Sequence, residues 1–284
     1  MIQVLITGAN GQLGNEFRLL AKDSNLSFIF TDVAELDITN SSAIELFLTQ
    51  NKVDFIINCA AYTAVDKAET DIELATLINS KAPELLAIES EKRNIKFIHV
   101  STDYVFDGKN YKPYVETDIV SPQSVYGNTK LQGELNTLRE NSNAIIIRTS
   151  WLYSSFGNNF VKTMIRLGKE KDSLGVIFDQ VGTPTYAKDL AQTILTIISS
   201  DFIPGIYHYS NEGACSWFDF AKEIHELTKV NCNVNPIETK DYPTPACRPH
   251  YSILNKSKIK NTYNIQIPHW KESLKKCIED LIKN

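Results

Sequence analysis

Five short apolar runs, separated by longer stretches with helical spacing, constrain the fold of this chain more than any other feature. Each run is nearly continuous in hydrophobic residues, as strands are when helices cover both faces of their sheet. Connections between such parallel strands are right-handed crossovers. The pattern predicts an α/β fold with a doubly wound parallel sheet, whose strands are residues 2–7, 27–32, 54–60, 96–102 and 144–150.

The pattern loosens after about residue 150, where prolines become frequent. Further strands are expected at residues 173–179 and 205–210, and the proline-rich residues 241–251 must turn or extend. We expect a first domain of residues 1–150, with part of residues 176–205 packed on it. Residues 151–284 then form mainly a smaller second domain. Ligands of open α/β sheets bind beyond the carboxyl ends of the strands, so the cleft between the domains is the expected site.

Length and charge exclude several classes of protein. A formal net charge of -5 over 284 residues, without a basic stripe, gives no footprint for nucleic acid. The sequence "MIQVLITGAN" lacks a basic leader, and no run reaches the roughly 18 apolar residues of a membrane span, which predicts a cytoplasmic protein without a membrane partner. The five scattered cysteines form no C-x-x-C motif and indicate neither disulfides nor zinc.

Gly8, Gly11 and Gly14 form G-x-x-G-x-x-G between the first predicted strand and the first predicted helix. This is the place of the dinucleotide loop in a Rossmann-type sheet, where glycines permit a tight turn and a close approach to a pyrophosphate. We expect Asn10, Gln12 and Leu13 of the same loop to contact the cofactor too. The alternative is a turn whose glycines serve packing alone.

Asp32 ends the second predicted strand, where an acid can accept hydrogen bonds from an adenosine ribose. No arginine or lysine follows it directly to clamp a 2'-phosphate. The sequence therefore favours NADH and tolerates NADPH if Asp32 turns aside. Other residues expected to border the cofactor follow the second and third strands: Asp37, Ile38, Ala60, Ala61 and Tyr62.

Tyr126 and Lys130 lie four residues apart in "VYGNTKLQGE", so they share one face of a predicted helix. An ammonium near a tyrosine favours the phenolate and brings its pKa toward working pH. Thr102, at the end of the fourth strand, adds a hydroxyl that could donate to the same carbonyl oxygen. The alternative is an ordinary helix surface, because Y-x-x-x-K is common by chance.

Together, the glycine loop, Thr102, Tyr126 and Lys130 resemble the extended short-chain dehydrogenase/reductase family. Six further blocks narrow the resemblance to the dTDP-4-dehydrorhamnose reductases within that family. They run over most of the chain, at residues 60–69, 101–108, 124–134, 148–153, 157–164 and 178–191. The resemblance implies NADPH- or NADH-dependent reduction of the C4 keto group of dTDP-4-dehydro-L-rhamnose by a substrate-binding second domain and a cofactor-binding first domain.

The resemblance also implies roles for single residues. Thr102 and Asp103 would contact the sugar, and Trp151 would border it. Tyr126 would protonate the C4 oxygen, while Lys130 would hold the nicotinamide ribose and tune Tyr126. Two alternatives stay open, since Asp103 could cap the loop after its strand and Trp151 could be a core aromatic residue.

Arg248 lies in "PTPACRP", which resembles the substrate-domain loop of the family. It is a candidate to approach the nucleotide diphosphate, and a surface ion pair is the alternative. Some members bind magnesium at a dimer contact through acidic residues. Glu16 and Glu212 are the candidate equivalents, but they complete no ligand set and we predict no metal. The sequence leaves the oligomeric state open, with a homodimer as one alternative.

Other chemistries on the same fold compete with simple reduction. Related 4,6-dehydratases carry Thr-Asp-Glu after the fourth strand, whereas this chain has Thr102, Asp103 and Tyr104. A phenol replaces a carboxylate poorly in proton exchange near neutrality, which disfavours elimination. Epimerases share the Thr, Tyr and Lys and are harder to exclude. A non-catalytic, cofactor-binding regulatory subunit is a third alternative.

Overall fold

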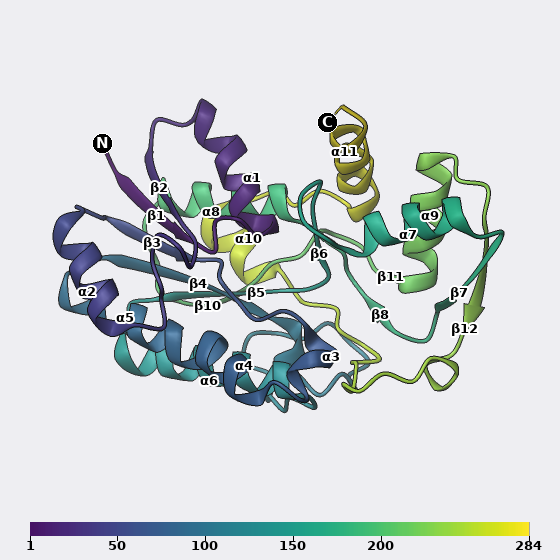
Figure 1. Cartoon of the computed structure of the whole chain (residues 1–284), viewed down its shortest axis with the longest axis horizontal. Coiled ribbons are helices and arrows are strands. Elements are labelled where there is room, and N and C mark those ends of the chain that lie inside the picture. Colours follow the sequence, from purple (N-terminus) through teal and green to yellow (C-terminus); the bar gives the residue numbers. More distant parts are fainter. Residues whose placement is uncertain (284) are drawn as a thin grey trace.

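The computed structural model describes residues 1–283, and its centre is a six-stranded parallel sheet (Figure 1). The strand order is β10-β5-β4-β3-β1-β2, with every neighbouring pair parallel. The chain leaves β1 toward β2 and returns on the other side of β1 to β3, which makes the β1/β3 boundary the switch point where ligands bind. The strands are β1 (Gln3–Thr7), β2 (Ser27–Thr31), β3 (Phe55–Asn58), β4 (Lys96–Thr102), β5 (Ile145–Thr149) and β10 (Gly205–His208).

Helices cover both faces of this sheet, which explains the continuous apolar runs. Val4 and Ile6 of β1 are buried in a core on one face, and the intervening Leu5 is buried in a separate core on the other. One face is covered by α1 (Gln12–Leu20), α8 (Ala187–Ile198) and α10 (Ser257–Tyr263). The other is covered by α2 (Ser41–Gln50), α5 (Ala82–Lys92) and α6 (Val125–Glu140) (Figure 1).

The smaller C-terminal domain has its own core and three two-stranded sheets. The pairs are β6 (Leu152–Tyr153) with β9 (Thr185–Tyr186), β7 (Ser173–Ile177) with β12 (Asn233–Ile237), and β8 (Val181–Gly182) with β11 (Cys215–Ser216). Its helices are α7 (Phe160–Glu170), α9 (Trp217–Thr228) and α11 (Trp270–Lys283). Aromatic side chains such as Tyr153, Tyr186 and Phe220 pack at its centre.

The predicted α/β class and parallel sheet are confirmed, and all five predicted N-terminal runs are strands of that sheet. The run at residues 205–210 supplies the sixth strand, β10, which pairs with β5. The expected division at residue 150 stays a prediction. Three later elements also pack on the first domain: α8, which lies within the residues 176–205 expected there, and also β10 and α10. The helical connection from β3 to β4 includes a π-helical turn, η2 (Leu77–Lys81), between α4 (Ile72–Thr76) and α5.

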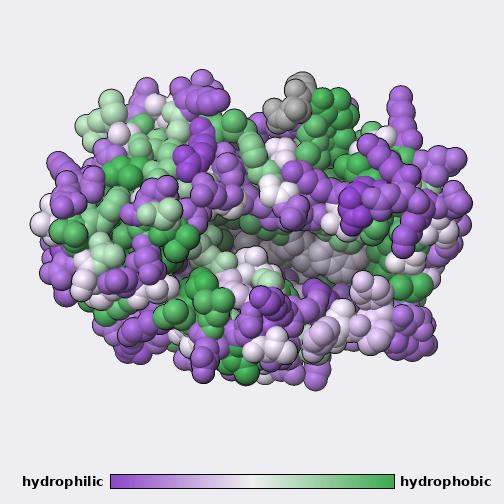
Figure 2. Space-filling model, viewed as in Figure 1, coloured by the Kyte–Doolittle hydropathy of each residue, from purple (hydrophilic) through white to green (hydrophobic). Residues whose placement is uncertain are grey.

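Short helices complete the connections: α3 (Val65–Ala68) and the 3-10 turns η1 (Ala21–Asp23), η3 (Asp103–Val105) and η4 (Thr239–Asp241). Among the described helices we find no apolar stretch of the length that a membrane crossing requires. The space-filling view shows a hollow between the two domains (Figure 2). It lies where the cleft was expected.

Candidate active site

The glycine loop connects β1 to α1 and packs tightly against its neighbours. Gly8 has a φ of +65°, and a Cβ there would lie 2.6 Å from the backbone of Ala60. A Cβ on Gly14 would lie 2.5 Å from Ala9 Cα. Gly11 caps α1 without a side-chain hydrogen bond, so no side chain occupies the positive end of the helix. A side chain fits at neither Gly8 nor Gly14, so the backbone at the start of α1 stays open to the approach of an anion.

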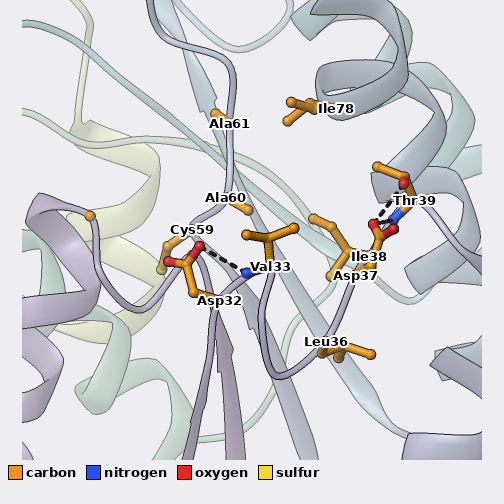
Figure 3. Close-up of a pocket in the computed structure, with 12 residues that line it drawn as sticks. Asp32, Val33, Leu36, Asp37, Ile38, Thr39, Cys59, Ala60, Ala61 and Ile78 are labelled. Carbon is orange, nitrogen blue, oxygen red and sulfur yellow. Dashed lines mark hydrogen bonds between the residues drawn. The ribbon is translucent and has the colours of Figure 1, made fainter. Parts of the chain in front are cut away.

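A pocket opens beside this loop, over the ends of β2 and β3 (Figure 3). Asp32 Oδ2 accepts a hydrogen bond from the Asn10 N–H at 3.0 Å, and its Oδ1 accepts one from the Val33 N–H at 2.9 Å. The carboxylate therefore joins the glycine loop to the end of β2. The lining includes the expected Asp37, Ile38, Ala60 and Ala61, and it adds residues that sequence reasoning missed, namely Val33, Leu36, Thr39, Cys59 and Ile78.

Tyr62, the last of the predicted cofactor neighbours, does not line that pocket. Its hydroxyl donates to Asp71 Oδ2 at 2.8 Å. Its backbone is held by Asn79, whose Oδ1 accepts from the Tyr62 N–H at 2.8 Å. Asn79 is fully buried in the π-helical turn and also donates to Thr129 Oγ1 of α6 at 3.2 Å. Sequence reasoning missed Asn79, although a π turn is frequent at functional sites.

Thr102 and Tyr126 meet where β4 ends and α6 begins. Ser124 caps α6 by accepting from the Gly127 N–H at 3.1 Å, which fixes the helix start at Val125, one residue before Tyr126. Burial raises the pKa of Tyr126 above its usual value, although a hydrogen bond with Thr102 opposes the shift. The ring of Tyr104 packs edge-on against that of Tyr126 with centroids 5.3 Å apart.

Lys130 lies on the same helix, but its ammonium points toward the sheet. Its Nζ donates to the Val100 carbonyl at 2.7 Å and lies 3.4 Å from His99 Nε2. The side chain is 1% exposed, and burial lowers its pKa to about 8. The expected lowering of the Tyr126 pKa by Lys130 is therefore not seen in this structure, where Thr102, Asp103 and Tyr104 are the residues that act on Tyr126.

Asp103 is buried directly beside Thr102. Its Oδ1 accepts a hydrogen bond from Thr102 Oγ1 at 3.0 Å. Burial raises the pKa of Asp103 to about 6, and the neighbouring hydroxyl groups of Ser252 and Thr102 oppose the shift. Thr102, rather than Asp103, caps the turn after β4, because its Oγ1 accepts from the Tyr104 N–H at 3.2 Å.

Trp151 adopts a left-handed backbone conformation, with a φ of +46°. Such a conformation is rare for a bulky residue and persists only where the surroundings enforce it. Its ring stacks on Trp217 at 3.5 Å, and Gly182 leaves room for it, since a Cβ there would lie 2.7 Å from the indole. Trp151 thus packs against the core of the C-terminal domain while remaining partly exposed.

Arg248 forms an ion pair, which is one of the two alternatives for this residue. The pair links the two domains. Its Nη2 lies 2.6 Å from Asp66 Oδ2, and its Nη1 donates to the Tyr104 hydroxyl at 3.2 Å. The Ala246 N–H donates to the same Asp66 carboxylate at 3.3 Å. The proline-rich residues 242–250, which we call the strap, therefore cross from the second domain to the first and lie beside Tyr126.

The two acidic residues considered for magnesium lie in separate environments. Glu16 is fully buried and accepts from Ser154 Oγ at 2.6 Å, and burial raises its pKa. Glu212 accepts from Lys260 at 2.7 Å and pairs with Lys256 at 3.4 Å. Within residues 1–283, no group of three or more His, Cys, Asp or Glu side chains is placed to hold a metal ion.

A parallel sheet with a glycine loop in its first crossover, and with Thr102, Tyr126 and Lys130 at the end of β4 and the start of α6, defines an oxidoreductase of the extended short-chain dehydrogenase/reductase class. The family model described as the RmlD substrate binding domain matches residues 2–283, and this chain belongs to that family.

Named relatives agree with this assignment. The chain is 43% identical to a dTDP-4-dehydrorhamnose reductase of Aggregatibacter actinomycetemcomitans, over 97% of this chain and 98% of that protein. It is similar to the crystal structure of a dTDP-4-dehydrorhamnose reductase from Clostridium acetobutylicum, with a TM-score of 0.95, 46% identity and 100% of both chains covered. The enzyme of that name from Bacillus anthracis, solved in complex with NADP, gives a TM-score of 0.95 at 40% identity, over 99% of this chain and 100% of that one.

Proposed function

We propose that this chain reduces the C4 keto group of dTDP-4-dehydro-L-rhamnose with NAD(P)H to give dTDP-L-rhamnose. The observation that carries the proposal is the meeting of Thr102 and Tyr126 at the sheet edge that also bears the nucleotide pocket. Membership of the family and the names of its relatives support the substrate.

The residues around the glycine loop fit a dinucleotide. Side chains at Gly8 or Gly14 would collide with the neighbouring backbone, so the surface there stays open for a phosphate. The uncapped N-terminus of α1 would hold the pyrophosphate, Asp32 the adenosine ribose, and Ile38 one side of the adenine. The bound cofactor would supply the hydride, and the protein supplies position and charge.

Tyr126 is the proposed general acid. Its raised pKa keeps the phenol protonated across the physiological range, so it is able to donate to an oxygen that gains negative charge. Thr102 places a second hydroxyl at the same point, oriented by its contact with Asp103. Trp151 and Arg248 approach from the second domain, where we assign them to the sugar and the diphosphate.

Tyr104 bears on the competing elimination chemistry. Burial raises the pKa of its phenol to about 12, and its hydroxyl is bound to Arg248. A group that keeps its proton so firmly is unsuited to exchange protons near neutrality. The third residue of the Thr-Asp-Tyr sequence therefore serves packing and loop attachment, which favours reduction over dehydration.

Tyr126→Phe tests the proposal. We expect turnover to fall by at least about 100-fold, the scale of general acid catalysis, with the Kd for NADPH unchanged. Tyr62→Phe is the matched control, because its hydroxyl binds Asp71 away from the pocket. Turnover is followed as oxidation of NADH or NADPH on adding the keto-sugar nucleotide. Near-normal turnover in Tyr126→Phe would contradict the assignment of Tyr126 as the general acid.

Stoichiometry separates the reductase from the alternatives. A reductase oxidises one NAD(P)H per sugar and converts nothing without free reduced cofactor. An epimerase or dehydratase recycles bound NAD, and a regulatory subunit binds cofactor without turnover. Conversion of dTDP-glucose by protein carrying only bound NAD would contradict the proposal. Light scattering on the same purified protein decides whether it is a homodimer, which the sequence leaves open.

A further inference from the structure

A row of three buried polar residues crosses the sheet beneath Lys130. Thr7 on β1, Asn58 on β3 and His99 on β4 are direct neighbours in register, and each is at most 1% exposed. Residues paired in register point to the same face of a sheet, so the three side chains form one line. Lys130 from α6 ends this line, with Nζ 3.4 Å from His99 Nε2.

The first step fixes the orientation of the Asn58 amide. Its Oδ1 accepts from the backbone N–H of Ala60 at 3.1 Å and from Thr7 Oγ1 at 2.7 Å. A backbone N–H can only donate, so the oxygen of the amide must face Ala60. The Nδ2 group therefore faces His99, whose Nδ1 lies 3.1 Å away.

The second step fixes the proton of His99. Asn58 Nδ2 is a donor only, so His99 Nδ1 must accept and carries no proton. Burial lowers the pKa of His99 well below its usual value, which keeps the ring neutral. A neutral imidazole with a bare Nδ1 has its proton on Nε2, the atom that faces Lys130.

We propose that His99 is a positioning residue that sets the proton affinity of Lys130 by aiming its Nε2–H at the amine. An ammonium has no lone pair to accept this N–H, whereas the neutral amine has one. When Lys130, which we assign to the nicotinamide ribose, gives its proton to hydroxide as pH rises, one N–H bond breaks and one O–H bond of water forms. The resulting amine is then stabilised by the hydrogen bond from His99. The place of Lys130 in catalysis rests on the proposed function.

Other charged and titratable groups also face Lys130. Glu134 lies one turn further along α6 and favours the ammonium, but it is held in a buried pair with Arg148 at 2.7 Å. Cys59, after β3, is the remaining titratable neighbour, and burial raises the pKa of its thiol. These groups favour a proton on Lys130, so they oppose the effect of His99 and do not mimic it.

The experiment titrates Lys130 directly in the full chain. Lysine is labelled with 13C at Cε, the Lys130 signal is assigned with Lys130→Met, and its pKa is measured by NMR. In His99→Gln the amide oxygen can accept from Asn58 Nδ2 or from the ammonium, and the charge-assisted bond to the ammonium is the stronger, so we expect the pKa of Lys130 to rise by about one unit or more. Asn58→Leu removes the donor that fixes the imidazole, lets Nε2 accept from the ammonium, and shifts the pKa in the same direction.

His208→Gln is the matched control, because His208 is another fully buried histidine of the sheet, with Nδ1 3.1 Å from the Tyr114 carbonyl. It should leave the Lys130 titration unchanged. The Lys130 ammonium is lost as pH rises through its pKa, so kcat/KM should fall at alkaline pH. In both test variants this fall should move to higher pH, in step with the Lys130 pKa measured by NMR. An unchanged or lowered Lys130 pKa in His99→Gln and Asn58→Leu, or an equal shift in the control, overturns the proposal. If the wild-type protein were inactive on the sugar, the proposed function would be refuted. The NMR test of the effect of His99 on the Lys130 pKa would still be valid.

Discussion

At the scale of single residues, burial moves the acid–base groups of the site toward their neutral forms. It raises the pKa of Tyr126, raises that of Asp103 to about 6 and lowers that of Lys130 to about 8. Dipoles and hydrogen bonds act more strongly where water is excluded. The site is therefore suited to stabilise a charge that develops during the reaction.

Asp103→Asn should stabilise the fold at neutral pH. The folded protein holds the Asp103 proton more tightly than the unfolded chain does, since its pKa is raised from 3.8 to about 6. Stability therefore falls as pH rises through that window and stays reduced above it. We expect a gain of about 2–3 kcal/mol in the free energy of unfolding above about pH 6, and little gain below about pH 4. Urea unfolding across this range measures it.

Asp107→Asn provides the contrast for that experiment. A hydrogen bond from the Tyr114 hydroxyl lowers the pKa of Asp107. Its ionised form contributes stability that is lost as pH falls, so this variant should be less stable than wild type near neutrality. If both variants showed the same pH trend, the explanation by burial of Asp103 would fail.

Asp32→Ala should raise the use of NADPH relative to NADH. The carboxylate lies in the nucleotide pocket, where its charge opposes a 2'-phosphate. Loss of its bond to the Asn10 N–H should weaken both cofactors somewhat, but the ratio of their Kd values should shift by about 10-fold toward NADPH. Cofactor fluorescence measures both values, with the exposed Asp23→Ala as control. An unchanged ratio would show that Asp32 faces away from the ribose.

At the scale of elements, α6 and the π-helical turn η2 fit each other closely. A Cβ on Gly133 would lie 2.1 Å from the Asn79 carbonyl oxygen, and Asn79 also bonds Thr129 of α6. The glycine lets the helix that carries Tyr126 approach the turn that holds the backbone of Tyr62. The same turn carries Ile78, which lines the nucleotide pocket, so this contact aligns that pocket with the helix of Tyr126.

Gly133→Ala should disturb that contact. The methyl group meets backbone that cannot move aside easily, so we expect a loss of at least about 2 kcal/mol in the free energy of unfolding and weaker NADPH binding. Gly175→Ala is the control, since its Cβ meets only the Ile237 side chain, at 3.2 Å. Denaturant unfolding of the two variants compares them, and equal losses would contradict the reasoning.

Sequence reasoning succeeded where the physical signal is local. Continuous apolar runs mark doubly covered strands, and glycine spacing marks the loop after β1. It could not choose a sheet for β10, because pairing with β5 is a long-range contact. The spacing of Tyr126 and Lys130 predicts a shared helix face but not a partner, so the contacts of Lys130 with Val100 and His99 went unforeseen.

At the scale of the whole molecule, the strap joins the second domain to the first. Arg248 contacts Asp66 from the first domain and the hydroxyl of Tyr104, whose ring packs on Tyr126. A change at Arg248 therefore alters both the contact between the domains and the surroundings of Tyr126, the proposed general acid.

Arg248→Ala should weaken binding of the nucleotide sugar more than it slows the chemical step. A guanidinium is suited to a diphosphate, and its loss also frees the strap. We expect KM to rise by about 10-fold or more, with a smaller change in kcat. Arg139→Ala removes an exposed ion pair with Glu84 and Glu140 and serves as control. Steady-state kinetics measures KM and kcat for both variants. An unchanged KM in Arg248→Ala would indicate that Arg248 has a purely structural role.

The stacked indoles of Trp151 and Trp217 also give the protein an optical reporter. Two of its three tryptophans lie ring on ring, 9° from parallel, on segments far apart in the sequence. Indoles in such contact share their electronic excitation, so near-ultraviolet absorption and emission depend on how the two segments are placed. Light alone, without a label or a substituted residue, thus follows movement of the second domain on the side of the cleft proposed for the sugar.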